Sequence, residues 1–463
     1  MPQLTRKLAA FVADLDDQKI PQQVRDRIKL IILDHIGIGV RARQQAALAP
    51  ALHDALEDLG QLSGNCRVIG DAQGYSPYAA ALFNGNIGHA LDFDDTHAPG
   101  SLHSGAPIIP AAMSAAQVSG ASGAAVMRGV IAGFEVQIRI SLALDPSAHY
   151  DQGFHPTATC GVFGAAAAAA VVMGLNTEQI HNAFGLCASH AAGTMQFLLD
   201  GAWNKPYHTG CAAANGLMAA CMARHGFIGV REALEGRYGF LHAYAPNADP
   251  DKLLDKLGSE WKSLGVAVKP YPSCRYTHAA LDALINLKSH HQIDYTQIES
   301  VEIGIPETGV KLVGLPIEAK QHPQNYVDGQ FSMPFVAAVA LRDGAMGWDS
   351  YAQHLGDEQT LALCRKVTVV SDPRAEAEFP ANMSAVARLN TRAGNFEELV
   401  VTPRGEPDNF MSDAEMRAKF TTLTGPYLST ARREELLGSL FAMEQVTDIA
   451  ALLDLSRPDV RQS

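Results

Sequence analysis

The chain has 463 residues, more than one hydrophobic core usually supports, so we expect two folding units. Hydrophobic residues make up 47% of the sequence and charged residues 18%, which is typical of a globular protein and too apolar for a disordered chain. The formal net charge of -13 argues against a protein that coats nucleic acid or an anionic membrane surface, because both attract basic proteins.

The first residues, MPQLTRKLAAFVADLDD, gain acidic side chains within one helix length and lack the apolar core of a secretory signal. We therefore expect a cytoplasmic protein with no membrane anchor. The apolar run CGVFGAAAAAAVVMGL is mostly alanine and shorter than a bilayer span. Seven cysteines are scattered and never form a C-x-x-C pair, so neither a disulfide framework nor a thiolate-held metal cluster is predicted.

From residue 5 to about 245, apolar residues recur at spacings of three and four, which predicts helices. The segment 161–174 consists almost entirely of small residues, so it can approach neighbouring helices closely and is predicted to be a central core helix. Asn176 followed by Gln179 has the pattern of a capping box, which predicts the start of another helix.

After residue 245 the pattern changes to alternating strands and helices. Strands are predicted at four places, 298–306, 365–372, 384–391 and 396–403. A helix is predicted over 277–291, and helical periodicity returns at Ser412, where Ser412 and Glu415 form a second capping box. The fold is therefore predicted to be mainly α. A large all-helical domain is built from both chain ends, 1–267 and 406–463, and 268–405 forms a smaller α+β domain.

Three carboxylates and a histidine crowd the stretch DFDDTH, residues 92–97. If a helix runs from about Ala79 to Asp95, then His89, Asp92, Asp95 and Thr96 share one face and Asp94 points away. That face could hold a metal ion on His89, Asp92 and Asp95. It could instead be a helix end capped by its own side chains, or it could serve acid–base chemistry without a metal.

Two lysines precede proline and tyrosine at turns that lead towards apolar helices: Lys205 and Lys269. A helix N-terminus already favours anions, so a lysine placed there adds a charged hydrogen bond to a carboxylate. His103 lies in the loop PGSLHSGAP, and His155 precedes Pro156 in a similar setting. Histidine is the default proton donor or acceptor near neutral pH, so this set suits proton transfer beside a carboxylate.

Four motifs, HALDFDDTH, HPTATCG, KPYHTGCAAANG and KPYPSCRYTHAALDAL, occur in an order and at separations that resemble the MmgE/PrpD family over nearly the whole chain. That family includes 2-methylcitrate dehydratase, cis-aconitate decarboxylase and iminodisuccinate epimerase, which use no metal and no organic cofactor. The resemblance implies a large helical domain made from both chain ends, a smaller α+β domain that acts as a lid, and usually a homodimer.

The resemblance also implies roles for individual residues, which we carry over motif by motif. His103 is the leading acid–base residue and His155 the second, and Asp92 joins them in the catalytic set. Lys205 and Lys269 serve that set as well by gripping the substrate carboxylates. The remaining substrate-binding candidates are Thr96, Arg275 and Tyr326. Two features bear on the substrate: Ser104 follows His103 where the family commonly has proline, and KPYHTG resembles the decarboxylase branch more than the dehydratases.

The sequence thus predicts a cofactor-independent acid–base enzyme that acts on a small di- or tricarboxylate, as a lyase of the dehydratase or decarboxylase kind. An epimerase of an imino- or amino-dicarboxylate is the first alternative. A metal-dependent helical enzyme and a carboxylate-binding paralogue without activity also stay open. No Gly-x-Gly-x-x-Gly, no phosphate-binding loop and no Gly-x-Ser-x-Gly occurs, which disfavours nucleotide use and serine hydrolysis.

Overall fold

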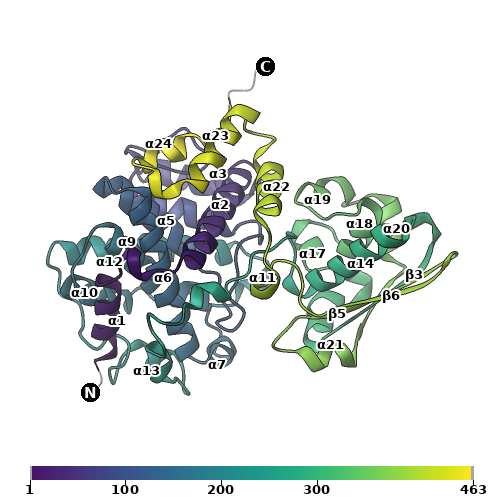
Figure 1. Ribbon diagram of the computed structural model, residues 1–463, viewed down its shortest axis with the longest axis horizontal. Helices are drawn as coiled ribbons and strands as arrows, with labels where there is room; N and C mark the ends of the chain where they lie inside the picture. Colours follow the sequence, from purple (N-terminus) through teal and green to yellow (C-terminus); the bar gives the residue numbers. More distant parts are fainter. Residues whose placement is uncertain (1–2, 460–463) are drawn as a thin grey trace. The chain divides into compact units, whose positions relative to one another are not determined.

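A computed structural model describes residues 3–459 of the chain. These residues divide into two compact units, one containing both chain ends, up to Ala267 and from Ser412, and the other formed by Val268–Met411. The predicted mainly α fold is confirmed. In Figure 1 the purple N-terminal helices and the yellow C-terminal helices belong to the same unit. None of the described helices is both long and apolar enough to cross a lipid bilayer.

The first unit is helical apart from one short antiparallel pair, β1 (Cys66–Arg67) and β2 (Gly74–Tyr75). Its helices before residue 268 are α1 (Leu4–Ala13), α2 (Gln22–Gln45), α3 (Leu48–Asp58), α4 (Pro77–His89), α5 (Gly105–Ser119), α6 (Gly123–Ala143), α7 (Pro146–Asp151), α8 (Pro156–Thr159), α9 (Gly161–Val172), α10 (Thr177–Cys187), α11 (Phe197–Asp200), α12 (Asn204–Arg224) and α13 (Phe240–Tyr244). The C-terminal segment adds α22 (Asp413–Thr424), α23 (Thr430–Phe441) and α24 (Ile449–Asp454).

Helix α9 is the predicted central core helix, and its residues from Gly161 to Ala170 are buried. Its small side chains let other helices approach closely: a Cβ atom at Gly216 of α12 would lie 2.5 Å from the Cβ atom of Ala165. Both predicted capping boxes are present, at the start of α10 and at the start of α22.

Glycines also allow short distances between the helices that carry predicted site residues. A Cβ atom at Gly85 of α4 would lie 2.7 Å from the Cα atom of Gly210 in α12. A Cβ atom at Gly37 of α2 would lie 3.0 Å from the ring of Phe420 in α22. Since α4 ends at His89 and α12 begins one residue before Lys205, the first of these contacts fixes the separation of two predicted site residues.

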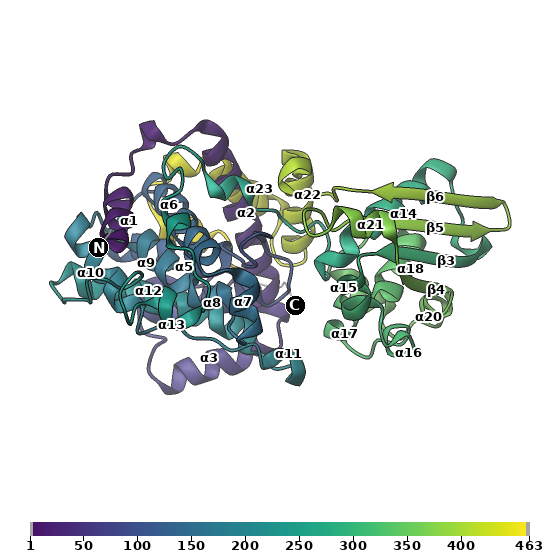
Figure 2. The ribbon, with the colours of Figure 1, turned by 90° about the horizontal axis from the view of Figure 1, so that it is seen from below.

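The second unit contains a four-stranded sheet in the order β4-β3-β5-β6, as Figure 2 shows. The strands are β3 (Ile298–Ile305), β4 (Val367–Ser371), β5 (Ala385–Thr391) and β6 (Gly394–Val400), which confirms all four predicted strands. Strands β3 and β4 are parallel, whereas β5 is antiparallel to both β3 and β6. The longer helices of this unit are α14 (His278–His291) and α18 (Met333–Asp343); shorter ones are α15 (Glu307–Gly309), α16 (Ile317–Lys320), α17 (Tyr326–Gln330), α19 (Asp349–His354), α20 (Glu358–Cys364) and α21 (Pro373–Glu378).

We predict opposite effects for alanine at a glycine in a tight helix contact and for alanine at a glycine with open space around it. Gly85→Ala places a methyl group against the backbone of Gly210, so we expect it to lower the free energy of unfolding by about 1–3 kcal/mol. Gly438→Ala, inside α23 with no atom within 4 Å of the new Cβ, is the matched control and should stabilise the protein by up to about 1 kcal/mol. Urea denaturation of both variants tests this, and equal effects would contradict it.

Candidate active site

The DFDDTH stretch is a turn rather than a helix. Helix α4 ends at His89, and Asp92 has φ 51°, in the left-handed region that a side chain other than glycine rarely adopts. The prediction of a helix reaching Asp95 is therefore wrong, because α4 ends at His89 and the left-handed backbone of Asp92 cannot continue a right-handed helix. The prediction that Asp94 points away from His89 is wrong for the same reason: the two side chains are hydrogen bonded, with 2.7 Å between His89 Nδ1 and Asp94 Oδ2.

The three acids of this turn have three different partners. Asp92 Oδ1 accepts a hydrogen bond from Lys205 Nζ at 2.7 Å. Asp94 Oδ2 lies 2.7 Å from His89 Nδ1 and 3.4 Å from His103 Nδ1. The Asp95 carboxylate accepts hydrogen bonds from the backbone N–H groups that precede and begin α5. The three acids therefore do not act as one cluster.

The metal set suggested by the sequence, His89 with Asp92 and Asp95, is not assembled in this way. Among the described residues, the group around DFDDTH with the spacing of metal ligands is instead His89, Asp94 and His103, whose ligand atoms lie within 4.8 Å of one another. Imidazole and carboxylate ligands of this kind suit zinc and other divalent transition metals. Both Nδ1 atoms already face a carboxylate oxygen, so the same geometry also serves a purely hydrogen-bonded cluster.

Hydrogen bonding fixes the tautomer of His103. Its Nδ1 lies 2.8 Å from the backbone carbonyl oxygen of Asp95 and 3.4 Å from Asp94 Oδ2, and both of these atoms can only accept. Nδ1 therefore carries the proton, and Nε2 can take a proton in the neutral ring or give one from the imidazolium. The His103 side chain is 16% exposed whereas that of His89 is 0% exposed, so His103 is the ring of this pair that a ligand can reach.

A second pair of histidines lies beside the first. His155 precedes α8, and its ring centroid is 6.3 Å from that of His89. Its Nδ1 is 3.3 Å from Nδ1 of His208, which lies on α12 one helical turn after Lys205. Sequence reasoning did not single out His208 or Asp94. The signal for His208 was its spacing of three from Lys205 in KPYHTG, which places both side chains on one helix face.

Burial and neighbouring charges set the protonation of this cluster. Burial lowers the pKa of His89 to about 4, although Asp94 opposes this. Burial and the charges around it also hold the pKa of His155 well below its usual range. Burial alone would raise the pKa of Asp94, but His89 and His103 outweigh it and hold that pKa well below its usual range. Burial likewise disfavours charge on Lys205, but Asp92 outweighs it and raises the lysine pKa. The cluster thus combines an ionised Asp94, a charged Lys205 and neutral imidazoles at His89 and His155.

The other predicted site residues are Thr96 in the first unit and three residues of the second unit. Thr96 is buried, and its backbone pairs with Ala267 through two hydrogen bonds of 2.9 and 2.8 Å. Lys269, Arg275 and Tyr326 belong to the second unit. Lys269 is buried, the Arg275 guanidinium forms two hydrogen bonds to the carboxylate of Glu406, and the Tyr326 ring stacks on Trp348 with centroids 5.5 Å apart. The structure therefore brings together Asp92, His103, His155 and Lys205 in the first unit.

This arrangement places imidazoles, a buried carboxylate and the ammonium of Lys205 close together, which is the set of groups that acid–base chemistry needs. The model of the MmgE/PrpD N-terminal domain matches residues 6–253, and that of the MmgE/PrpD C-terminal domain matches residues 271–441. The chain belongs to the MmgE/PrpD family. The predicted family is confirmed.

Several relatives align over almost their whole length. The cis-aconitate decarboxylase-like protein oryM of Aspergillus oryzae is 27% identical and covers 98% of this chain and 97% of its own. The cis-aconitate decarboxylase of Aspergillus terreus is 27% identical over 98% of this chain and 95% of its own. That of Mus musculus is 26% identical over 98% and 93%. These relatives support an enzyme of the lyase class.

His35 is a buried histidine next to this cluster, on α2. A Cβ atom at Gly88 of α4 would lie 2.2 Å from its ring, so the ring packs directly against the helix that carries His89. Neither ring nitrogen has a hydrogen-bond partner among the described residues. Burial lowers the pKa of His35 to about 4. The unfolded chain therefore binds a proton at this residue between about pH 6.5 and pH 4, where the folded chain does not.

This difference predicts that His35 destabilises the fold progressively as the pH falls from 6.5 to 4. Relative to His35→Gln, the wild type should lose up to about 1.4 kcal/mol of unfolding free energy for each pH unit in that range. Denaturant unfolding of both proteins at pH 7.5, 6 and 5 measures the difference. His242→Gln, at an exposed position of α13, is the control and should follow the wild type at each pH. Parallel curves for wild type and His35→Gln would contradict the prediction.

Proposed function

We propose that this enzyme is a cofactor-independent carbon–carbon lyase that removes CO₂ from a small unsaturated tricarboxylate of the cis-aconitate kind. The observation that carries the proposal is the Asp94 carboxylate shared by His89 and His103, beside the ion pair of Lys205 and Asp92. The names of the full-length relatives supply the substrate class. Dehydration or epimerisation of a related di- or tricarboxylate stays an alternative, because each also requires a proton to be moved at carbon.

The proposed reaction needs one proton donor and no electron acceptor. When a carboxylate lies two carbons from a double bond, loss of CO₂ breaks one carbon–carbon bond, and its electron pair forms a new double bond to the middle carbon. The electrons of the old double bond then take a proton at its far carbon. His103 Nε2 donates that proton, and the Asp94 carboxylate stabilises the imidazolium that precedes the transfer. A proton from water restores the ring, so each turnover consumes one proton and releases one CO₂.

Lys205 is proposed to bind a substrate carboxylate. Its ammonium lies in the first turn of α12, whose free N–H groups and dipole also favour an anion. Asp92 orients it at 2.7 Å, and the lysine side chain is 26% exposed, so a second carboxylate can reach it. His155 and Thr96 are proposed to line the same pocket. The family resemblance also proposes Lys269, Arg275 and Tyr326 as carboxylate ligands, and the Arg275 guanidinium is hydrogen bonded to Glu406.

Two alternatives keep specific support. The close spacing of His89, Asp94 and His103 favours a metal-dependent enzyme as the second candidate. Such a metal would replace the protons that we assign to both Nδ1 atoms, so the two candidates exclude each other. A carboxylate-binding paralogue without activity would keep Lys205 and its partner but turn nothing over.

Incubation with cis-aconitate, 2-methylcitrate and iminodisuccinate in deuterated water, followed by NMR, tests the reaction. We expect CO₂ loss from cis-aconitate with one deuterium at the former alkene carbon. Because His103 supplies that proton, His103→Gln should lower kcat by at least about 100-fold. Lys205→Met removes one charged hydrogen bond, worth about 1.5–3 kcal/mol, and should lower kcat/KM by roughly 10- to 100-fold. His242→Gln should have wild-type kinetics.

Other outcomes of the same assay assign the alternatives. Deuterium exchange without loss of carbon or oxygen would indicate an epimerase, and loss of water from 2-methylcitrate a dehydratase. Activity that disappears in chelator and returns with one equivalent of a divalent metal would favour the metal-dependent enzyme. Near-normal decarboxylation by His103→Gln would contradict the role of that residue.

We also propose that the enzyme is a homodimer, as the family resemblance implies. Large apolar side chains are exposed along α11, α12 and the segment that follows α12, including Leu199 at 81% and Tyr238 at 84% exposed. Trp203, Tyr207 and Ile228 are exposed with them. A set of this kind on one domain is typical of a surface that meets another protein.

If these residues form the dimer interface, introducing carboxylates among them should lower the molecular mass of the protein in solution to that of a monomer. The variant carrying both Leu199→Asp and Ile228→Asp should sediment as a monomer at concentrations where the wild type is a dimer, because a buried unpaired carboxylate opposes association. Leu312→Asp, at an exposed apolar residue of the second unit, is the control and should stay dimeric. Sedimentation velocity measures this, and a monomeric wild type would contradict it.

A further inference from the structure

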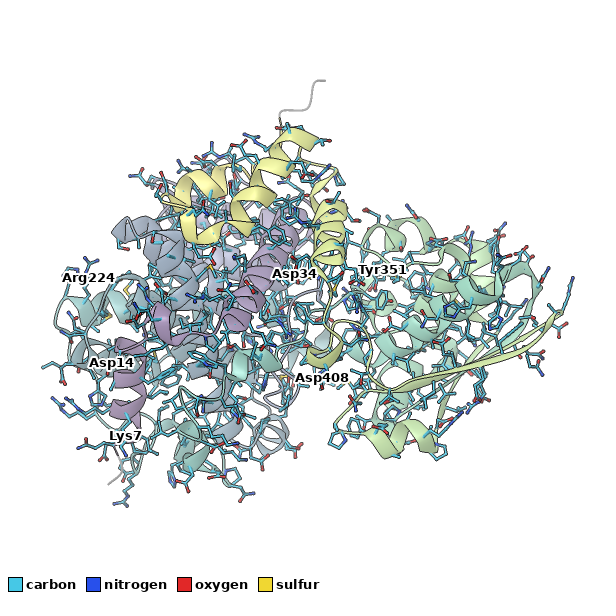
Figure 3. The ribbon with its side chains drawn as sticks, viewed as in Figure 1. Lys7, Asp14, Asp34, Arg224, Tyr351 and Asp408 are labelled. Carbon is cyan, nitrogen blue, oxygen red and sulfur yellow. The ribbon has the colours of Figure 1, made fainter. Side chains whose placement is uncertain are left out.

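A buried lysine lies beneath the DFDDTH turn. Lys419 is on α22, in the C-terminal segment, and its side chain is 4% exposed. Its Nζ is 2.7 Å from Oδ1 of Asp34 on α2 and donates a hydrogen bond of 2.9 Å to the backbone carbonyl of Phe93. The same ammonium lies 3.8 Å from the centroid of the Phe93 ring. Asp34 is labelled in Figure 3, where α2 and α22 lie beside each other.

Phe93 is the residue between two acids with different partners. Asp92 on one side binds Lys205, and Asp94 on the other side binds His89 and His103. The backbone reaches this arrangement through the left-handed conformation of Asp92, which the surrounding structure must hold in place. The contact of Lys419 with the Phe93 carbonyl, together with its contact with the ring, holds the peptide in the middle of this turn.

We propose that Lys419 is a positioning residue for the reaction: its ammonium fixes the Phe93 peptide and so directs Asp92 towards Lys205 and Asp94 towards His103. Lys419 does not contact the substrate; it acts by holding the turn in place. This inference rests on the proposed function, because the reaction that the turn serves is the proposed one. The C-terminal segment is thereby part of the catalytic machinery, because it supplies the group that shapes a motif more than 300 residues earlier in the chain.

The plain alternative is a structural ion pair that joins α22 to α2. A buried pair of this kind destabilises the fold when either partner is removed, because the other charge is left buried and uncompensated. Under that alternative, Asp34 and Lys419 are equivalent, and activity falls only as far as the folded fraction falls. Under the proposal they differ, because it is Lys419 whose ammonium hydrogen bonds to the Phe93 carbonyl.

Three variants separate the two accounts: Lys419→Met, Asp34→Asn and the double variant. The double variant leaves no buried unpaired charge from this pair, so it should recover stability relative to Lys419→Met. We expect Asp34→Asn to keep kcat, per folded molecule, within about threefold of the wild type. Lys419→Met and the double variant should both lose at least about tenfold in kcat, because a small displacement of reacting groups is costly.

Lys29→Met is the matched control, since Lys29 also joins α2 to the C-terminal segment, through an ion pair with Glu444 at 3.0 Å that lies away from the turn. It should keep wild-type kcat. A double variant with wild-type kcat would overturn the proposal. So would an Asp34→Asn variant as slow, per folded molecule, as Lys419→Met.

A second measurement does not depend on the substrate. In protein labelled with ¹⁵N-histidine, NMR follows the Nδ1 protons of His89, which faces Asp94, and of His103, which faces the Asp95 carbonyl and Asp94. His103→Gln assigns the second signal. We expect both signals to be kept in Asp34→Asn and displaced in the double variant. Unchanged signals in the double variant would overturn the proposal. A wild type that acts on none of the carboxylates would overturn the proposed function, and the NMR comparison would still decide the role of Lys419.

Discussion

A single buried carboxylate organises this site. Asp94 is 2% exposed, and an isolated charge in such a place would be strongly unfavourable unless it were paired and hydrogen bonded. Two imidazoles supply that pairing by turning their Nδ1 atoms towards the same oxygen. The pairing settles three properties at once: Asp94 stays ionised, both rings carry their proton on Nδ1, and both present Nε2 on the far side. A histidine that must exchange protons at Nε2 needs this constraint, because the other tautomer would present N–H where a lone pair is required.

The helices that hold this carboxylate come from distant parts of the chain. His89 is the last residue of α4, His103 precedes α5, and α22 from the other end of the sequence lies behind the turn. Glycines at the contacts between helices make the approach possible, as between Gly85 and Gly210. With the alanine-rich α9 at its centre, the unit depends on close packing of helices rather than on large side chains. Both chain ends take part in this packing, since α2 and α22 meet at Gly37 and Phe420.

The sequence predicted what depends on local pattern. The capping residues Asn176 and Ser412 begin helices as expected, and period-two alternation located all four strands of the sheet. The site residues came from their local sequence setting and from motif resemblance, which name residues but not their contacts. The turn at Asp92 was missed, since no periodicity signals that a non-glycine residue adopts the left-handed conformation. Asp94 was placed on the wrong side as a direct result, and the contact of Lys419 with Phe93 carries no signal in a single sequence.

The charges of the site are consistent with the proposed substrate, which carries several carboxylates. Lys205 is neutralised by Asp92 in the free enzyme, so a substrate anion must gain more than one ion pair to justify its own loss of hydration. A single carboxylate competes with Asp92 and gains little. A polyanion can gain additional charged hydrogen bonds through its other carboxylates. Because buried His89 and His155 stay neutral, they add hydrogen-bonding capacity without adding charge. The proposed preference for a di- or tricarboxylate then rests on how firmly Asp92 already holds Lys205.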